Sequence, residues 1–176
     1  PSAVLGGKVA APDKIVINLT GDGGFGINPS CLATAVEHGI ACTWVVMNNS
    51  AFGTIAGLEN ANYKTKFGTV FYKPDGERYT ICWADVAKSY GIESICVNSA
   101  EEFKPALEKA IAANKEGRPF LVEAPMENIV VPTPGCWNIN DIYTPNALVK
   151  EGKLVKKENG RYVAPSHSKS HDGCLN

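Results

Sequence analysis

Two polar side chains, Asp22 and Asn49, each follow a strand-like run of apolar residues in this sequence of 176 residues. Asp22 lies in the glycine-rich stretch Gly21-Asp22-Gly23-Gly24-Phe25-Gly26, directly after the run Lys14–Thr20. The second run, Thr43–Met47, ends on Asn48-Asn49. Carboxylate and amide oxygens are the hard ligands that Mg²⁺ prefers. The residue types therefore indicate a cation site, provided that the fold brings the two side chains together.

A parallel sheet would bring Asp22 and Asn49 together, because the carboxyl ends of its strands share one edge, where ligands bind. Free backbone N–H groups at a glycine turn and helix start favour an anion such as phosphate. A carboxylate beside a diphosphate is repelled unless a cation lies between them, and Mg²⁺ commonly binds a carboxylate together with substrate phosphates. We expect its ligands to be Asp22, the Asn49 amide and a loop carbonyl, best placed at Ala51, with the diphosphate and a water completing the shell.

The two-part motif resembles the diphosphate-binding motif of thiamine-diphosphate enzymes. Gly21-Asp22-Gly23 precedes Asn48-Asn49, and Asn48–Thr54 is similar to that family's Asn-Asn-x-x-Tyr-Gly run. The resemblance covers roughly residues 1–130 and is to the acetolactate synthase, benzoylformate decarboxylase and pyruvate decarboxylase group. It implies the thiamine-diphosphate-binding fold, with Mg²⁺ on Asp22, Asn49 and Ala51. It also implies cofactor contacts at Gly21, Gly23, Gly24, Phe25, Asn49, Ala51, Phe52, Gly53 and Thr54.

The resemblance implies catalysis on 2-oxo acids, by decarboxylation, carboligation or both. Gly-Asp-Gly-Gly-Phe, common in the acetolactate synthase branch, gives a slight preference for acetolactate-synthase-like chemistry. In this family the activating Glu belongs to a pyrimidine-binding domain, so no catalytic residue is assigned here. That domain or subunit and a 2-oxo acid are the expected partners, and a homo-oligomer, dimer or tetramer, is expected. We interpret the chain as a fragment or subunit of a larger enzyme, inactive without the missing domain.

Three alternatives use the same residues. Gly21-x-Gly23-x-x-Gly26 matches the dinucleotide-binding fingerprint, but that fingerprint requires an acidic residue about 20 positions later, and the second run ends without a carboxylate. A plain strand-turn-helix, with Asn48-Asn49 forming a turn, explains each half of the motif alone but not both halves together. A cofactor-binding or assembly subunit without catalysis would keep the same ligands, and this alternative stays open.

Periodicity predicts an α/β fold, with a parallel sheet in βαβ units and helices on both faces. Two single residues are further candidates for catalysis. Glu123 lies at a strand end, where a solvated or paired carboxylate is the more common case. His38 lies at a helix end, and we interpret it as structural. Residues 53–80 have no regular pattern and are interpreted as a loop that covers the site or packs elsewhere. The expected elements beyond the two runs are helices Ser2–Ala11, Pro29–Gly39, Trp83–Tyr90 and Ser99–Lys115 and strands Ile92–Val97 and Pro119–Ala124.

Composition excludes several classes of function. The net charge is −1 without a basic patch, which argues against nucleic-acid binding. No apolar run of about 18 residues exists, so no membrane span is expected. Six cysteines without C-x-x-C spacing argue against zinc and iron–sulfur sites and favour a reducing cytoplasm, with disulfide pairing as the lesser alternative.

The chain after the predicted cofactor domain, residues 1–130, has a different composition. Residues 131–164 form a Pro-rich extension in which Trp137 is a candidate for a subunit contact and Glu158-Asn159-Gly160 a candidate hairpin turn. Residues 165–176 are expected to be a flexible tail. The spacing of His167 and His171 there would suit a metal only on a helix, which nothing in the tail supports.

Overall fold

The computed structural model describes residues 1–65, 67–127, 149, 152, 155–156 and 162–163. Contacts divide the chain into two compact units, Pro1–Val130 and Val131–Asn176, and each is described by itself. The candidate site belongs to the first unit, which contains a parallel sheet and the helices packed on it.

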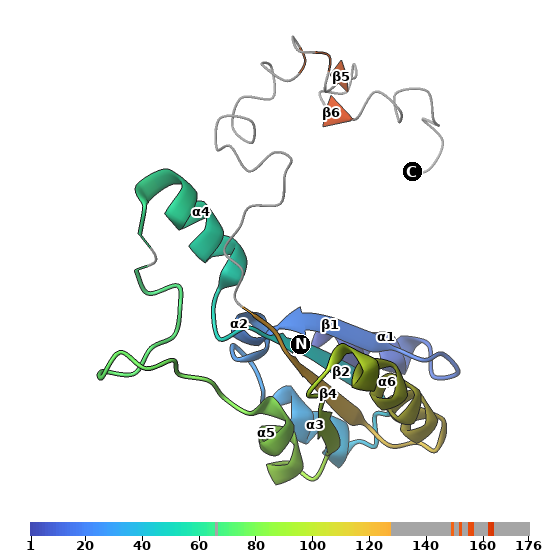
Figure 1. Cartoon of the computed structure of the whole chain (residues 1–176). Coiled ribbons are helices and arrows are strands. Elements are labelled where there is room, and N and C mark those ends of the chain that lie inside the picture. The colour runs from blue at the N-terminus through green and yellow to red at the C-terminus, as the bar shows by residue number, and fades with distance from the viewer. Residues whose placement is uncertain (66, 128–148, 150–151, 153–154, 157–161, 164–176) are drawn as a thin grey trace. The chain divides into compact units, whose positions relative to one another are not determined.

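The sheet of the first unit has four strands in the order β1-β2-β4-β3, and every pairing is parallel (Figure 1). Gly21 stands opposite Met47, and Asn48 opposite Pro125, so the carboxyl ends of three strands meet at one edge. The inner strands are apolar on both faces because helices cover both, as is usual for parallel sheets. The strands are β1 (Ile17–Gly21), β2 (Thr43–Asn48), β3 (Glu93–Cys96) and β4 (Phe120–Pro125).

Helices cover both faces of the sheet, as the sequence predicts. On one face, α1 (Ala3–Ala10), α3 (Cys31–Glu37) and α5 (Trp83–Ser89) pack in one core cluster with Trp44 and Val46 of β2. The short helix α2 (Asp22–Phe25) joins this cluster. On the other face, α6 (Ala100–Lys115) packs its small residues against β2 and β4. The α/β fold with a parallel sheet and helices on both faces is therefore confirmed.

The stretch 53–80 differs from the prediction, because its first part is a helix. The helix α4 (Gly53–Tyr63) begins beside the strand ends and runs away from the sheet (Figure 1). The glycines favour a loop, yet Gly57 in a helix costs only about 1 kcal/mol relative to alanine. The helix gains the packing of Ala56 against Ala51 and Val70. The segment that follows, residues 67–80, is called the return segment. It is irregular apart from isolated antiparallel bridges, Ala51 to Val70 and Tyr72 to Arg78.

The second unit is described at few positions. They include an antiparallel pair, β5 (Val155–Lys156) and β6 (Tyr162–Val163), on either side of the predicted Glu158-Asn159-Gly160 turn. That turn, Trp137 and the tail from residue 165 lie outside the described residues.

Two further findings concern predictions from composition. Within the described ranges, no helix is long and apolar enough to cross a membrane. The four cysteines that the structure describes have free thiols: Cys31, Cys42, Cys82 and Cys96.

Candidate functional site

The ends of β1 and β2 bring Asp22 and Asn49 into contact. Asp22 is buried, with only 3% of its surface exposed, and is the first residue of α2. Its two carboxylate oxygens accept hydrogen bonds from the backbone N–H of Asn49, at 3.4 Å, and of Ala51, at 3.2 Å. The proximity that the sequence predicts is therefore confirmed, and it follows from the parallel register of the two strands.

The side-chain amide of Asn49 meets two oxygen atoms at this point. One end of the amide lies 3.0 Å from Asp22 Oδ1 and 2.9 Å from the Ala51 carbonyl oxygen. Without a cation the amide nitrogen belongs at this end, because it donates a hydrogen bond to each oxygen. With a cation bound, the amide would turn its oxygen to the same place and complete a set of three oxygen ligands. In an octahedral Mg²⁺ shell with bonds of about 2.1 Å, neighbouring oxygens lie about 3.0 Å apart, so the spacing suits that ion.

The turn that carries these ligands has an uncommon backbone. Ser50, between Asn49 and Ala51, has φ 53°, in the left-handed region that non-glycine residues seldom occupy. Such conformations persist only where surrounding contacts hold them, and they cluster at binding sites. Here the return segment supplies contacts: Phe71 N–H donates to the Ser50 carbonyl, at 3.1 Å, and the Arg78 guanidinium donates to the Asn49 carbonyl, at 2.5 Å.

A pocket of about 360 Å³ opens at this edge of the sheet. Its lining includes nine of the ten residues that the sequence singles out; only Phe25 is absent, because its side chain is fully buried against Trp83, with ring centroids 5.2 Å apart. Sequence reasoning missed Met47, Ile55 and Met126. Met47 and Met126 lie at the carboxyl ends of β2 and β4, the edge where a ligand is expected in a parallel sheet, so their position was a usable signal. The predicted residues in the lining are Gly21, Asp22, Gly23, Gly24, Asn49, Ala51, Phe52, Gly53 and Thr54.

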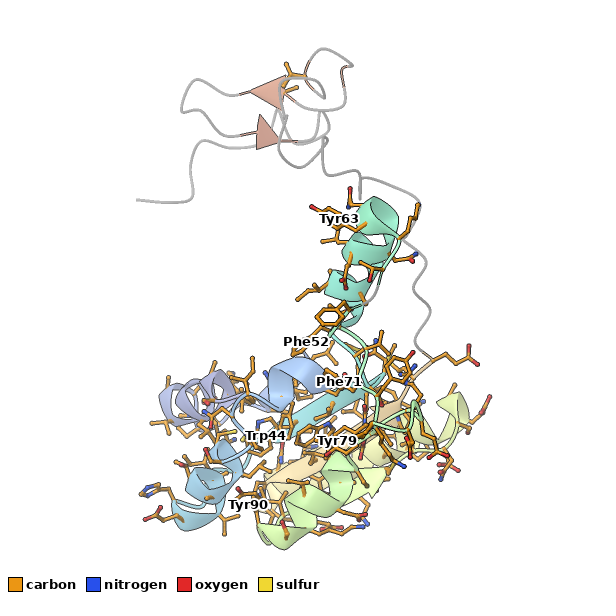
Figure 2. The ribbon with its side chains drawn as sticks, turned by 90° about the vertical axis from the view of Figure 1, so that its left-hand side faces the viewer. Trp44, Phe52, Tyr63, Phe71, Tyr79 and Tyr90 are labelled. Carbon is orange, nitrogen blue, oxygen red and sulfur yellow. The ribbon has the colours of Figure 1, made fainter. Side chains whose placement is uncertain are left out.

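Glycine at position 23 is required by a close approach. A Cβ on Gly23 would lie 2.6 Å from the ring of Phe52, which is closer than carbon atoms pack. The Phe52 ring also packs edge-on against Phe71, with centroids 5.2 Å apart, at the base of α4 (Figure 2). The loop after β1 therefore fits under the start of α4 only without a side chain at residue 23.

The electrostatics of the pocket are unusual for an anion site. Burial raises the pKa of Asp22 above its ordinary value, and backbone N–H donors, chiefly that of Asn49, oppose this effect in part. The residues lining the pocket include no Lys, Arg or His. The donors available for an anion are backbone N–H groups, including those of Gly53 and Thr54 at the start of α4, which have no partner within the helix.

Neither Glu123 nor His38 belongs to the pocket. Glu123 is 2% exposed and hydrogen-bonded to Asn48 Nδ2, at 2.6 Å, and to Ala84 N–H, at 2.8 Å, so it is paired rather than solvated. His38 is exposed at the end of α3, as a structural residue would be. In the described part of the chain, no group of three His, Cys, Asp or Glu residues could hold a metal. The candidate site has one carboxylate only.

The fold and the pocket define a class: an α/β domain with a pocket at the carboxyl edge of a parallel sheet. The family described as "Thiamine pyrophosphate enzyme, C-terminal TPP binding domain" matches residues 1–124, and the chain belongs to this family. The membership accounts for the two-part motif and disfavours the dinucleotide-binding alternative.

Individual relatives catalyse different reactions. Sulfoacetaldehyde acetyltransferase of Alcaligenes xylosoxydans is 36% identical over 121 residues, 68% of this chain and 19% of the relative. A probable acetolactate synthase large subunit of Methanocaldococcus jannaschii is 32% identical over 135 residues, 76% of this chain and 22% of the relative. The thiamine diphosphate-dependent 4-hydroxybenzoylformate decarboxylase of Rhodococcus jostii superposes with a TM-score of 0.59 at 27% identity, over 71% of this chain and 22% of that one. The chain thus spans about a fifth of each.

Proposed function

We propose that residues 1–130 bind thiamine diphosphate through Mg²⁺, as the diphosphate-binding domain of an acetolactate-synthase-like enzyme that acts on 2-oxo acids. The observation that carries the proposal is that the Asp22 carboxylate, the Asn49 side-chain amide and the Ala51 carbonyl meet, with the amide 3.0 Å from Asp22 Oδ1 and 2.9 Å from the Ala51 oxygen. This set of one carboxylate, one amide and one carbonyl suits a hard cation that keeps water and phosphate oxygens in its remaining positions.

The charge of the pocket supports the metal as well. A diphosphate placed here would meet Asp22 with no cationic side chain among the residues that line the pocket. Backbone N–H groups at Gly23, Gly24 and the start of α4 favour the phosphate oxygens. They do not neutralise the carboxylate, so a divalent cation between carboxylate and diphosphate is the arrangement that balances the charges.

When bound, thiamine diphosphate supplies a ring carbanion that adds to a 2-oxo acid and stabilises the charge left after CO₂ departs. The residues of this chain have simpler tasks. Asp22, Asn49 and Ala51 hold the cation, the glycine loop holds the diphosphate, and Met47, Ile55 and Met126 give the pocket its apolar wall. Decarboxylation and carboligation differ in how the acceptor is bound, and the relatives named above include both types of chemistry.

The remainder of the enzyme is part of the proposal. Because the chain spans about a fifth of its relatives, we infer a pyrimidine-binding domain or subunit that supplies the activating Glu, and assembly as a homo-oligomer. The free thiols in the described part of the chain agree with a reducing cytoplasm. A cofactor-binding subunit without catalysis would bind the same ligands, and the turnover measurement given in the Discussion separates it from an enzyme domain.

The test is substitution of the carboxylate, Asp22→Ala, followed by calorimetric titration of the chain with thiamine diphosphate at saturating Mg²⁺. Loss of a direct metal ligand should weaken binding by at least about a hundredfold, the upper range for residues that merely support ligands. The matched control is Asp85→Ala, because Asp85 is exposed, does not line the pocket and forms its ion pair with Lys88, at 2.9 Å, on α5. Equal affinity for the wild type and Asp22→Ala would show that the metal assignment is wrong.

A further inference from the structure

Asn48, the first asparagine of the Asn-Asn pair, is buried and does not line the pocket. Its amide nitrogen donates to the Ile81 carbonyl, at 2.8 Å, and to Glu123 Oε1, at 2.6 Å. Its amide oxygen accepts the backbone N–H of Ser50, at 3.1 Å. Asn48 therefore connects the end of β2, the loop before α5, strand β4 and the turn that carries the candidate metal ligands.

The partner on β4 is a carboxylate whose contacts are all donors. Glu123 stands opposite Val46, two residues before Asn48, so both polar side chains project from the same face of the sheet. Its second oxygen accepts Ala84 N–H, at 2.8 Å, and the Cys82 thiol, at 3.6 Å. Only a group that accepts on both oxygens satisfies Asn48 and Ala84 at once.

This pairing fixes the orientation of the Asn48 amide. Two acceptors, Glu123 and the Ile81 carbonyl, hold the amide nitrogen on their side, and the amide oxygen then faces Ser50 N–H. Ser50 has a left-handed backbone and separates Asn49 from Ala51, so the bond it receives helps to hold both candidate ligands in place. Residues that hydrogen-bond to metal ligands without touching the metal have large effects on metal affinity.

We propose that Glu123 is a positioning residue for the Mg²⁺ site, acting through Asn48 on the turn of residues 49–51. The inference rests on the proposed function, because it assumes that this turn binds the cation. Glu123 touches neither metal nor cofactor in this arrangement. Its role is to select one orientation of a buried amide and so to preset the distance between the Asn49 and Ala51 oxygens.

Glu123→Gln is the informative substitution, since it keeps the shape of the side chain. The new amide nitrogen must face either Asn48 Nδ2 or Ala84 N–H, and each choice brings two donors together. The Asn48 amide relieves the first conflict only by turning over, which places its oxygen against the Ile81 carbonyl and its nitrogen against Ser50 N–H. The turn then loses the hydrogen bond that holds its strained residue.

The experiment compares the affinity for thiamine diphosphate in the presence of Mg²⁺ with that in the presence of Ca²⁺. Thiamine diphosphate is titrated calorimetrically into the 176-residue chain, once with saturating Mg²⁺ and once with saturating Ca²⁺. Mg²⁺ demands near-ideal octahedral geometry, whereas Ca²⁺ tolerates variable distances and ligand numbers. Glu123→Gln should weaken binding about tenfold or more with Mg²⁺, and less than about threefold with Ca²⁺. A substitution that only destabilises the fold would change both affinities alike.

Thr43→Val is the matched control, because Thr43 lies at the opposite end of β2 from Asn48. The Thr43 hydroxyl donates to Asn114 Oδ1, at 2.8 Å, and both residues are buried, so this substitution also removes a buried polar contact. It should leave the preference for Mg²⁺ over Ca²⁺ unchanged. In the double variant Asn48→Asp with Glu123→Gln, the new carboxylate accepts from the glutamine amide and from Ser50 N–H, and the glutamine oxygen accepts from Ala84 N–H. Only the Ile81 carbonyl loses its donor, so the double variant should recover most of the preference for Mg²⁺. It carries the test if the single variant does not fold.

The outcomes separate the two proposals. Equal losses with Mg²⁺ and Ca²⁺ in Glu123→Gln, or no recovery in a folded double variant, would overturn the positioning role and leave the proposed function intact. An absence of saturable binding by the wild-type chain with either metal would overturn the proposed function, and this inference with it.

Discussion

Asp22 is a buried carboxyl group, and burial of a carboxylate is unfavourable unless its charge is paired. Burial raises its pKa, so the metal-free folded chain holds the proton more tightly than the unfolded chain does. The contribution of Asp22 to stability is then fully present below the usual pKa of an aspartate and is lost as the pH rises through the raised value. At neutral pH Asp22 carries a buried charge that the backbone N–H donors compensate only in part, and a divalent ion would compensate the rest.

The pH dependence of stabilisation by Mg²⁺ and thiamine diphosphate follows from the raised pKa of Asp22. Proton and cation compete for Asp22, so the increase in Tm should be largest near neutral pH and shrink on acidification, starting above the usual titration range of an aspartate. Thermal melts between about pH 5 and pH 8, with and without both ligands, measure it. Asp22→Ala should show no increase at any pH. An increase in the wild type that stays constant toward acid would contradict the argument.

At the scale of elements, α4 has few contacts to hold it. Its apolar contact with the rest of the unit is a small cluster in which Ala56 packs with Ala51 and Val70. The carboxylate of Glu59 accepts the N–H of Phe67, at 2.9 Å, and the Thr69 hydroxyl, at 2.8 Å. Segments with few buried apolar contacts open locally at low free energy. Glu59 therefore connects α4 to the return segment, which contacts the turn of residues 49–51.

Removal of that connection should loosen α4 while leaving the sheet unchanged. In Glu59→Ala the two hydrogen bonds to a charged acceptor are lost, at a local cost of about 2 kcal/mol, or roughly thirtyfold faster amide exchange. Hydrogen exchange should therefore increase within residues 53–71 and stay constant in β2 and β4. Glu37→Ala is the control, because Glu37 is exposed and its ion pair with His38 spans 3.9 Å. Unchanged exchange in α4 would show that Glu59 does not hold the segment.

At the scale of the whole molecule, the pocket is open and several of its apolar side chains are exposed. The exposed fractions are 38% for Phe52, 54% for Ile55 and 51% for Met126. Catalysis on a reactive cofactor requires a site from which water is excluded. The exposed apolar wall agrees with our proposal that a further domain or subunit completes the site.

The chain by itself should therefore bind the cofactor weakly and release no CO₂ from a 2-oxo acid. The measurement uses pyruvate as the probe, with Mg²⁺ and thiamine diphosphate at concentrations that saturate the chain by calorimetry. Adding the pyrimidine-binding domain of the same enzyme should restore turnover, because it supplies the activating Glu. Robust CO₂ release without a partner would show that the chain is complete for catalysis. Binding without turnover even in the assembled enzyme would favour the non-catalytic subunit.

Much of the fold could be predicted because local patterns decided it. The apolar runs and helical periodicity gave the four strands and the helices on both faces, with ends close to those observed. The presence of α4 could not be predicted, since four glycines and interleaved aromatics in residues 53–80 suit a loop as well as a helix. Propensity is a weak term there, and contacts with the return segment, through Ala56 and Glu59, decide between the two.

The sequence by itself determined that Asp22 and Asn49 meet, because in a parallel sheet the carboxyl ends of neighbouring strands share an edge whatever the packing details. It also gave most of the pocket lining, and the binding roles of those residues stay predictions. Only the tertiary structure decided that Phe25 packs in the core, that Ser50 adopts a left-handed turn, and that Glu123 is buried against Asn48. Those outcomes depend on contacts between residues as many as 75 positions apart, and the spacing of residues along a chain carries no information about such contacts.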